Sequence, residues 1–250
     1  MLTITPIPAF QDNYIWLLQA GEHVACVDTG DAAPVLAYLQ QHRLQLSQIW
    51  LTHLHHDHTG GVAELLQAFP DCQVYGNDDI AHATHRVQEG SVIDFAYHTV
   101  QVWHTAGHTA QHLTFILSIN GQHHVFCGDT LFSAGCGRVF TGTMTQLYHS
   151  IQRFQTLPAD TLFYPAHEYT AANLRFAAHI EPENPAIAAA LSQAQTVPTL
   201  PVCLAHEQQI NPFLRLSQPA LQQRVAALSG TDLRNEADVF TALRLLKNQF

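Results

Sequence analysis

Basic residues are scarce in this sequence of 250 residues. Ten Lys and Arg residues stand against 20 Asp and Glu residues, which gives a formal charge of −10 with histidine neutral. Residues 1–200 hold 5 of the basic and 16 of the acidic residues, and residues 201–250 hold 5 and 4. This balance argues against a nucleic-acid partner, and a small anionic ligand would need basic groups placed locally.

Cysteine pairs and long apolar runs are also missing. The five cysteines include no C-x-x-C pair, which argues against a disulfide framework or a cysteine-rich zinc module and suits a reducing compartment. The first residues lack the basic head and apolar run of a secretory signal, and no apolar stretch approaches the ~20 residues of a membrane span. We therefore expect a cytoplasmic protein with no membrane partner.

Histidine, by contrast, is plentiful, with 18 residues, and metal-ligating side chains crowd into residues 52–61. The stretch Thr52-His53-Leu54-His55-His56-Asp57-His58-Thr59-Gly60-Gly61 follows an apolar run that predicts a buried strand, and its glycine pair predicts a turn into a helix. We expect these side chains to converge in a loop at the carboxyl end of that strand, without a helix to space them. Imidazole and carboxylate together suit zinc, iron or manganese.

The rest of the chain predicts strands and helices up to residue 165 and helices alone beyond it. Apolar runs predict strands at residues 3–7, 14–19, 24–27, 49–51, 72–75, 100–103, 113–119, 125–127 and 161–164. Helical periodicity is present around Val35 and over residues 145–157, 171–180, 186–194, 219–228 and 236–247. We therefore predict an α/β domain over residues 1–165 and a smaller helical domain over residues 166–250.

Four of the predicted strands end in clusters of histidine and aspartate, as a metal site at one edge of a sheet would require. Asp28 either caps the helix that follows it or orients a ligand histidine from outside, and His112 is either such an outer partner or an ordinary strand residue. One catalytic zinc takes three protein ligands and a water, so seven candidates suit two ions that share a carboxylate. These candidates are His53, His55, Asp57, His58, His108, Asp129 and His167.

Two sets of motifs carry a resemblance to known families. Thr-His-x-His-x-Asp-His over residues 52–58, followed by Gly107-His108-Thr109, Gly128-Asp129-Thr130 and His167, resembles the metallo-β-lactamase superfamily. Within it, the segments 131–138, 165–170, 211–215 and 244–250 resemble glyoxalase II, the hydroxyacylglutathione hydrolase family, and the likeness runs from end to end. The resemblance implies a metallo-β-lactamase-like αββα sandwich followed by a smaller α-helical domain.

The resemblance also implies roles for individual residues. His53, His55 and His108 would hold one divalent cation, Asp57, His58 and His167 a second, and Asp129 would bridge them; zinc is expected first, with iron and manganese as alternatives. The family's glutathione contacts map onto Arg138, Tyr169, Arg244 and Lys247. Arg and Lys suit the carboxylates of glutathione, and the last two are three positions apart on a predicted helix, hence on one side. Family members often have Tyr at the position of Phe140, so we expect one hydrogen bond fewer here.

The activity that follows is hydrolysis of the thioester of S-(2-hydroxyacyl)glutathione by a hydroxide that bridges the metals. S-D-lactoylglutathione would give D-lactate and glutathione, the second step of methylglyoxal detoxification. A thiolate with a pKa of about 8.5 leaves readily, so no strong general acid is needed. We expect a monomer that acts on this small molecule.

Other functions fit parts of the pattern. A persulfide dioxygenase with a single iron could keep Asp57 and His58 as non-ligands, although the helical tail with Arg244 and Lys247 argues against it. A non-catalytic metal-binding or scaffold protein would have no reason to keep all seven candidate ligands. A lactamase or nuclease relative would want a secretion signal or a basic surface.

Overall fold

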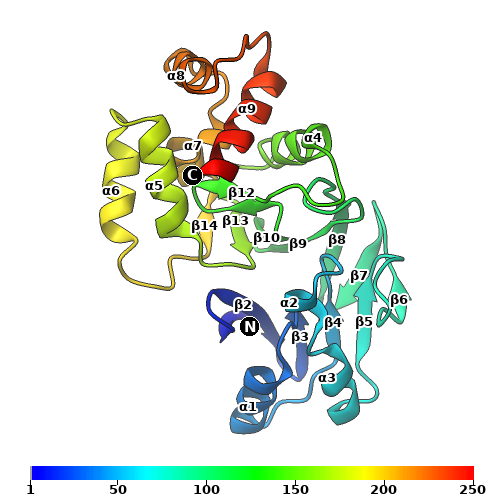
Figure 1. The fold of residues 1–250 in the computed structure, drawn as a ribbon. Coiled ribbons are helices and arrows are strands. Elements are labelled where there is room, and N and C mark those ends of the chain that lie inside the picture. Colours follow the sequence, from blue (N-terminus) through cyan, green and yellow to red (C-terminus); the bar gives the residue numbers. More distant parts are fainter. Residues whose placement is uncertain (1) are drawn as a thin grey trace. The chain divides into compact units, whose positions relative to one another are not determined.

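The computed structural model describes residues 2–250, and the chain divides into two compact units (Figure 1). The N-terminal unit comprises the chain up to residue 105 together with residues 111–128. The C-terminal unit comprises residues 106–110 and 129–250. The loop 106–110 therefore belongs to the second unit, although the residues on both sides of it belong to the first.

A six-stranded mixed sheet forms the first layer of the N-terminal unit. Its order follows the chain: β1 (Leu2–Ala9), β2 (Asn13–Ala20), β3 (His23–Val27), β4 (Gln48–Trp50), β5 (Gln73–Gly76) and β6 (His85–Arg86). The pairs from β1 to β3 are antiparallel and those from β3 to β6 are parallel. Helices α1 (Ala32–His42) and α3 (Val62–Ala68) pack on this sheet (Figure 1), with Val35, Leu39 and Leu65 in one apolar cluster with its strands.

Four antiparallel strands form the second layer of this unit. They are β7 (Val92–Phe95), β8 (His98–His104), β9 (Leu113–Ile119) and β10 (Gln122–Gly128), paired in chain order. Trp50 of β4 contacts Phe95, Phe115 and Phe126 from these strands, with ring centroids 5.5, 5.8 and 6.2 Å apart. The two sheets therefore share an aromatic core and form a sandwich.

The C-terminal unit is mainly helical. Its short strands are β11 (Leu131–Phe132) paired with β12 (Gly135–Cys136), and β13 (Leu162–Pro165) paired with β14 (Val202–Cys203). Its helices, several of them labelled in Figure 1, are α4 (Met144–Phe154), α5 (Thr170–Ile180), α6 (Pro185–Gln193), α7 (Leu204–Ile210), the 3₁₀ helix η1 (Pro212–Leu214), α8 (Pro219–Ser229) and α9 (Glu236–Gln249). Residues of α5, α6 and α7 share an apolar core that includes Leu174, Ile187 and Ile210.

Most predicted elements are present, and two expectations about the strands fail. β4 belongs to one sheet of the N-terminal unit and β8 and β10 to the other, so the clustered strand ends do not come from one sheet. That expectation is wrong because a sandwich lets strands of both layers end on the same side. Strand β14 also follows residue 167, where only helices were predicted.

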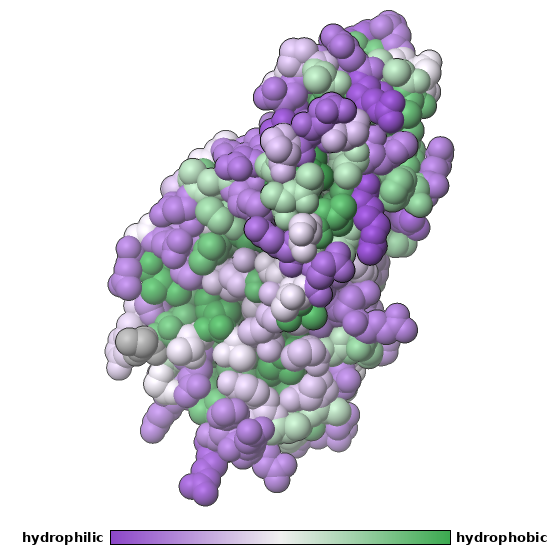
Figure 2. Space-filling model, turned by 90° about the vertical axis from the view of Figure 1, so that its left-hand side faces the viewer, coloured by the Kyte–Doolittle hydropathy of each residue, from purple (hydrophilic) through white to green (hydrophobic). Residues whose placement is uncertain are grey.

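The surface shown in Figure 2 mixes hydrophilic and hydrophobic residues in small areas. Within residues 2–250, no helix has both the length and the apolar character needed to cross a lipid bilayer.

Candidate metal centre and substrate site

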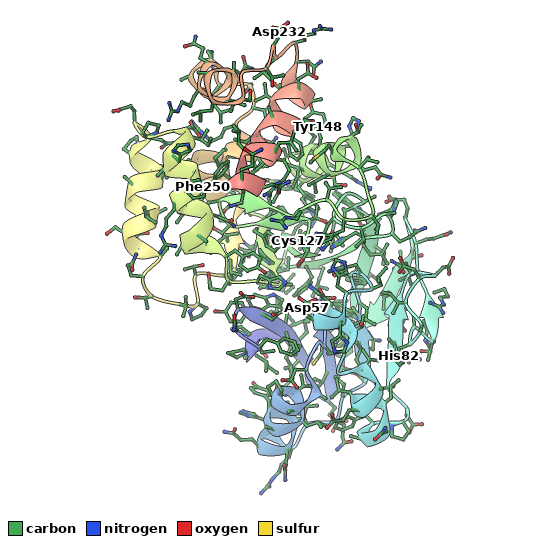
Figure 3. All side chains as sticks on the ribbon, in the orientation of Figure 1. Asp57, His82, Cys127, Tyr148, Asp232 and Phe250 are labelled. Carbon is green, nitrogen blue, oxygen red and sulfur yellow. The ribbon has the colours of Figure 1, made fainter. Side chains whose placement is uncertain are left out.

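Four of the seven candidate ligands lie just after β4 in the N-terminal unit (Asp57 is labelled in Figure 3). His53 Nε2 is 3.0 Å from His55 Nδ1, and His58 Nε2 is 3.5 Å from a carboxylate oxygen of Asp57. Two ligand atoms each 2.0–2.1 Å from a tetrahedral zinc lie roughly 3.4 Å apart. These spacings fit side chains that share ions. The expected loop contains one helical turn, α2 (His56–Thr59), so the prediction that no helix is involved is wrong.

Asp28 contacts two residues of this half-site, Thr52 and His58. Its carboxylate accepts hydrogen bonds from the backbone N–H and the hydroxyl of Thr52, at 2.8 and 2.9 Å, and lies 3.0 Å from His58 Nδ1. It holds a positive φ of 56°, which non-glycine residues rarely adopt. The N-cap of α1 is Asp31, so Asp28 does not cap this helix. Its carboxylate lies beside His58, as the second interpretation requires, and its role in orienting a ligand stays a prediction.

The hydroxyl of Thr52 extends this support to the next histidine. Because Thr52 donates its proton to Asp28, its oxygen can accept a bond from His53 Nδ1, which lies 3.0 Å away. That tautomer places the lone pair of His53 on Nε2, the atom that lies 3.0 Å from His55 Nδ1. His58, with Nδ1 toward Asp28, is in the same state. Sequence reasoning missed Thr52 because a threonine before a histidine has no distinguishing signal.

Two further side chains complete this half-site. The Asn13 amide donates to the Asp57 carboxylate at 3.2 Å. His112 is fully buried, stacks on His53 with ring centroids 4.9 Å apart, and lies 3.2 Å from the Thr105 hydroxyl. His112 is therefore in contact with His53, as its interpretation as an outer partner requires, and that role stays a prediction.

The remaining three candidate ligands meet in the C-terminal unit around Asp129. One Asp129 oxygen is 3.4 Å from His108 Nε2, and the other is 3.5 Å from His167 Nε2. His108 Nδ1 lies 2.7 Å from the carbonyl oxygen of Arg138, which fixes a tautomer with Nε2 toward the aspartate. A carboxylate with an imidazole beside each oxygen has the arrangement that a shared ligand requires.

Aromatic rings line this second half-site. Tyr169 stacks on His167 with centroids 4.7 Å apart and an interplanar angle of 9°, and Phe132 meets both rings edge-on at 5.1 and 5.9 Å. Phe140 is 59 % exposed and meets His108 edge-on. The predicted contact Tyr169 is thus held next to a candidate ligand.

The three basic candidates belong to the C-terminal unit and differ in burial. Arg244 is 4 % exposed, donates to the Cys136 carbonyl at 2.7 Å, and lies over the Phe213 ring. Lys247, half-buried, lies over the Phe176 ring at 4.9 Å, and burial, reinforced by the Arg244 charge, lowers its pKa to about 8. The side chain of Arg138 is exposed.

Comparison with known proteins covers the whole chain. Residues 10–167 match the family described as the metallo-beta-lactamase superfamily, and residues 168–250 match the hydroxyacylglutathione hydrolase C-terminus. A hydroxyacylglutathione hydrolase of Neisseria meningitidis serogroup C (strain 053442) is 56 % identical over 249 residues, covering 100 % of this chain and 99 % of the relative. The chain belongs to the hydroxyacylglutathione hydrolase family.

More distant members of this family and of the wider fold agree with that assignment. The hydroxyacylglutathione hydrolase of Vibrio cholerae serotype O1 (strain ATCC 39541) is 46 % identical over 258 residues, covering 100 % of both chains. The crystal structure of TTHA1623 in a di-iron-bound form superposes with a TM-score of 0.61 at 26 % identity, covering 85 % of this chain and 100 % of that one. The metallo-β-lactamase fold is confirmed. The clustered histidines and aspartates of this chain support the binding of divalent metals.

Proposed function

We propose that this protein hydrolyses the thioester of S-(2-hydroxyacyl)glutathione, with S-D-lactoylglutathione giving D-lactate and glutathione. The observation that carries the proposal is Asp129, whose two oxygens each face a different histidine at 3.4 and 3.5 Å. The full-length likeness to hydroxyacylglutathione hydrolases supports the choice of substrate. In the cell this reaction would be the second step of methylglyoxal detoxification.

The two half-sites would together hold two divalent cations. As the family resemblance implies, the first cation would be bound by His53, His55 and His108, the second by Asp57, His58 and His167, with Asp129 shared. The spacings within each half-site support this division. Zinc is proposed first, with iron and manganese compatible with the same ligands; the structural relative TTHA1623 was solved with two irons.

Bound in this way, the metals would activate water for attack and polarise the thioester carbonyl. The chain's own residues would prepare that chemistry. Asp28 and Thr52 fix the histidine tautomers, and the Arg138 carbonyl does the same for His108. No side chain needs to protonate the leaving group strongly, because a thiolate with a pKa of about 8.5 leaves without help.

The glutathione site would be formed by Arg138, Tyr169, Arg244 and Lys247. Arg244 supports this role because its Nε is buried and makes no hydrogen bond to any described residue, although Nη1 is engaged by the hairpin carbonyls. A guanidinium edge and a nearby ammonium suit the carboxylates of the peptide. Phe140 lacks the hydroxyl that relatives often have there, so it would contact the peptide without a hydrogen bond.

The proposal extends to organisation and location. The boundary between the metal-binding domain, residues 1–165, and the helical domain, residues 166–250, is supported by the family matches that meet between residues 167 and 168. The five cysteines form no disulfide within the described residues, which supports a cytoplasmic protein. We propose that it acts as a monomer.

Hydrolysis is tested by adding S-D-lactoylglutathione to protein loaded with zinc, iron or manganese and measuring free thiol and D-lactate. We expect equal amounts of both products with no oxygen consumed. Oxygen uptake on a glutathione persulfide, one iron per chain and no thioester cleavage would instead support the dioxygenase alternative.

A further inference from the structure

The hairpin formed by β11 and β12 turns through a strained backbone. Ala134, at the turn, has a φ of 54°, an αL conformation that is unfavourable for a residue with a Cβ. A buried carboxylate on α7 holds this turn in place. Glu207 is fully buried and accepts hydrogen bonds from the Ser133 hydroxyl and the Ala134 backbone N–H, both at 2.8 Å. A third bond comes from the Asn211 amide at 2.9 Å.

Two amides reinforce the same turn. Asn211 also donates to the carbonyls of Phe132 and Gly135, at 3.2 and 3.0 Å, and Asn173 of α5 donates to the Ser133 carbonyl at 2.8 Å. A Cβ on Gly135 would lie 2.7 Å from the Asn173 amide, so the backbone is in direct contact with that side chain. The hydroxyl and carbonyl of Ser133 and the N–H of Ala134 are thus each bonded to a side chain of α5 or α7.

The hairpin in turn connects to the groups proposed to bind glutathione. Phe132 packs edge-on against Tyr169. The carbonyl of Cys136 accepts the bond from Arg244, and Arg138 follows two residues later in the chain. A shift of this hairpin would therefore move the contacts to the peptide part of the substrate together.

We propose that Glu207 is a positioning residue for glutathione: it fixes the β11–β12 hairpin, which aligns Arg138, Tyr169 and Arg244 with the peptide. This role rests on the proposed function. The hydrogen bonds of Glu207 go to Ser133, Ala134 and Asn211, none of them a proposed metal ligand, so it sets substrate binding and leaves the reacting centre to the residues around Asp129. Neither its sequence position nor the motifs described above indicated this role.

Substitutions at Glu207 separate positioning from simple filling of space. Gln can accept the Ala134 N–H and the Asn211 amide at one oxygen and donate its own amide to the Ser133 hydroxyl, so Glu207→Gln preserves every bond. Leu has a similar volume and leaves the buried Ala134 N–H without an acceptor. Glu207→Leu should therefore release the strained turn, and Glu207→Gln should rescue it.

The test compares two thioesters in the metal-loaded enzyme. The first is S-D-lactoylglutathione, and the second is the lactoyl thioester of N-acetylcysteamine, which lacks both peptide carboxylates. For Glu207→Leu we expect kcat/KM to fall about tenfold or more on the first, mainly through KM, and to stay within about twofold on the second. For Glu207→Gln we expect both values to stay within about threefold of the wild type.

A parallel loss on both thioesters, or no change on either, would overturn the positioning role. If Glu207→Leu does not fold, Ser133→Ala removes one of the three bonds and should lower kcat/KM on S-D-lactoylglutathione by about threefold, with no comparable loss on the second thioester. A loss of kcat/KM that is equal on both thioesters, or absent on both, in Ser133→Ala overturns the role as well. Wild-type cleavage of S-D-lactoylglutathione, measured first, decides the proposed function on its own. A wild type that cleaves the substrate while the variants fail to discriminate refutes the positioning role alone.

Discussion

At the scale of single residues, three of the candidate histidines are oriented by an oxygen atom that lies close to Nδ1. His53, His58 and His108 each have Nδ1 within 3.0 Å of an oxygen, from Thr52, Asp28 and the Arg138 carbonyl. The histidines could be predicted because they form a dense motif. Their partners could not, apart from Asp28, because a threonine hydroxyl or a backbone carbonyl becomes a partner only through the tertiary fold.

Asp28 offers the sharpest test of this orientation. Asn tolerates the positive φ at this position but bears no charge to stabilise the His58 and Thr52 bonds. We expect Asp28→Asn to weaken metal binding about 10- to 100-fold, measured by competition with a chromogenic chelator. Asp31→Asn is the matched control, because Asp31 caps α1 and Asn caps a helix equally well. Unchanged metal affinity in Asp28→Asn would contradict the assignment.

At the scale of elements, long periodic segments were predictable and short ones were not. Helix α9 was expected over residues 236–247 and spans Glu236–Gln249. The two-residue strands of the β11–β12 hairpin and the seven-residue α7 were not expected, because they depend on partners from distant segments rather than on local periodicity. The hydrogen bonds of Glu207 come from these unpredicted elements.

Lys247 on α9, the only lysine in the chain, allows a pH test of the substrate site. Its ammonium is present below its pKa of about 8 and is lost above it. We therefore expect KM for S-D-lactoylglutathione to rise as the pH increases from 7 to 9, while kcat changes less. Lys247→Arg should keep KM flat over this range relative to the wild type, because arginine stays charged. The same rise in both proteins would remove Lys247 from the site.

Arg244 on the same helix has a second function that changes its expected phenotype. Arg244→Ala should raise KM, as loss of a peptide contact predicts, and should also destabilise the protein by about 1–3 kcal/mol because the Cys136 carbonyl loses its donor. Steady-state kinetics and urea unfolding measure the two effects. Lys247→Ala is the comparison, since its ammonium lies over a ring and bonds to no carbonyl of the described residues, and it should raise KM with little loss of stability. Unchanged KM in Arg244→Ala would count against the glutathione site.

At the scale of the whole molecule, the fold class and the family followed from motifs spread along the chain. The layered arrangement explains the one topological error: strand ends that were expected from one sheet come from two, because Trp50 joins the layers face to face. The order of motifs carries no information on which sheet each strand enters. The boundary at residue 165 stays a prediction.

Glu207 also gives the stability of the whole molecule a defined pH dependence. Burial raises its pKa to about 7, although bonds from Ala134, Asn211 and Ser133 act in the opposite direction. The unfolded chain loses this proton near the ordinary value of 4.5, so the folded state binds more protons between pH 4.5 and 7. Its contribution to stability therefore falls as the pH rises through that window and is constant above it.

We expect the unfolding free energy of the wild type, relative to Glu207→Gln, to fall by on the order of 3 kcal/mol between pH 4.5 and 7. The unfolding free energies of both proteins are measured with urea, in the presence of a chelator, at several pH values. Subtracting one from the other cancels the titration of the groups that the two proteins share. Glu64→Gln, at an exposed position on α3, should show no such slope when it replaces Glu207→Gln in the comparison. A flat difference for Glu207→Gln would mean that the buried carboxylate ionises in the folded state as easily as in water.

The account depends most on Asp129 as the ligand shared by two cations. The direct measurement is bound metal per chain together with the hydrolysis rate of S-D-lactoylglutathione, for metal-loaded wild type and Asp129→Ala. We predict two ions per chain with rapid cleavage in the wild type, and fewer ions with a near-complete loss of cleavage in the variant. An Asp129→Ala protein that keeps both its metal content and most of its activity would contradict the account.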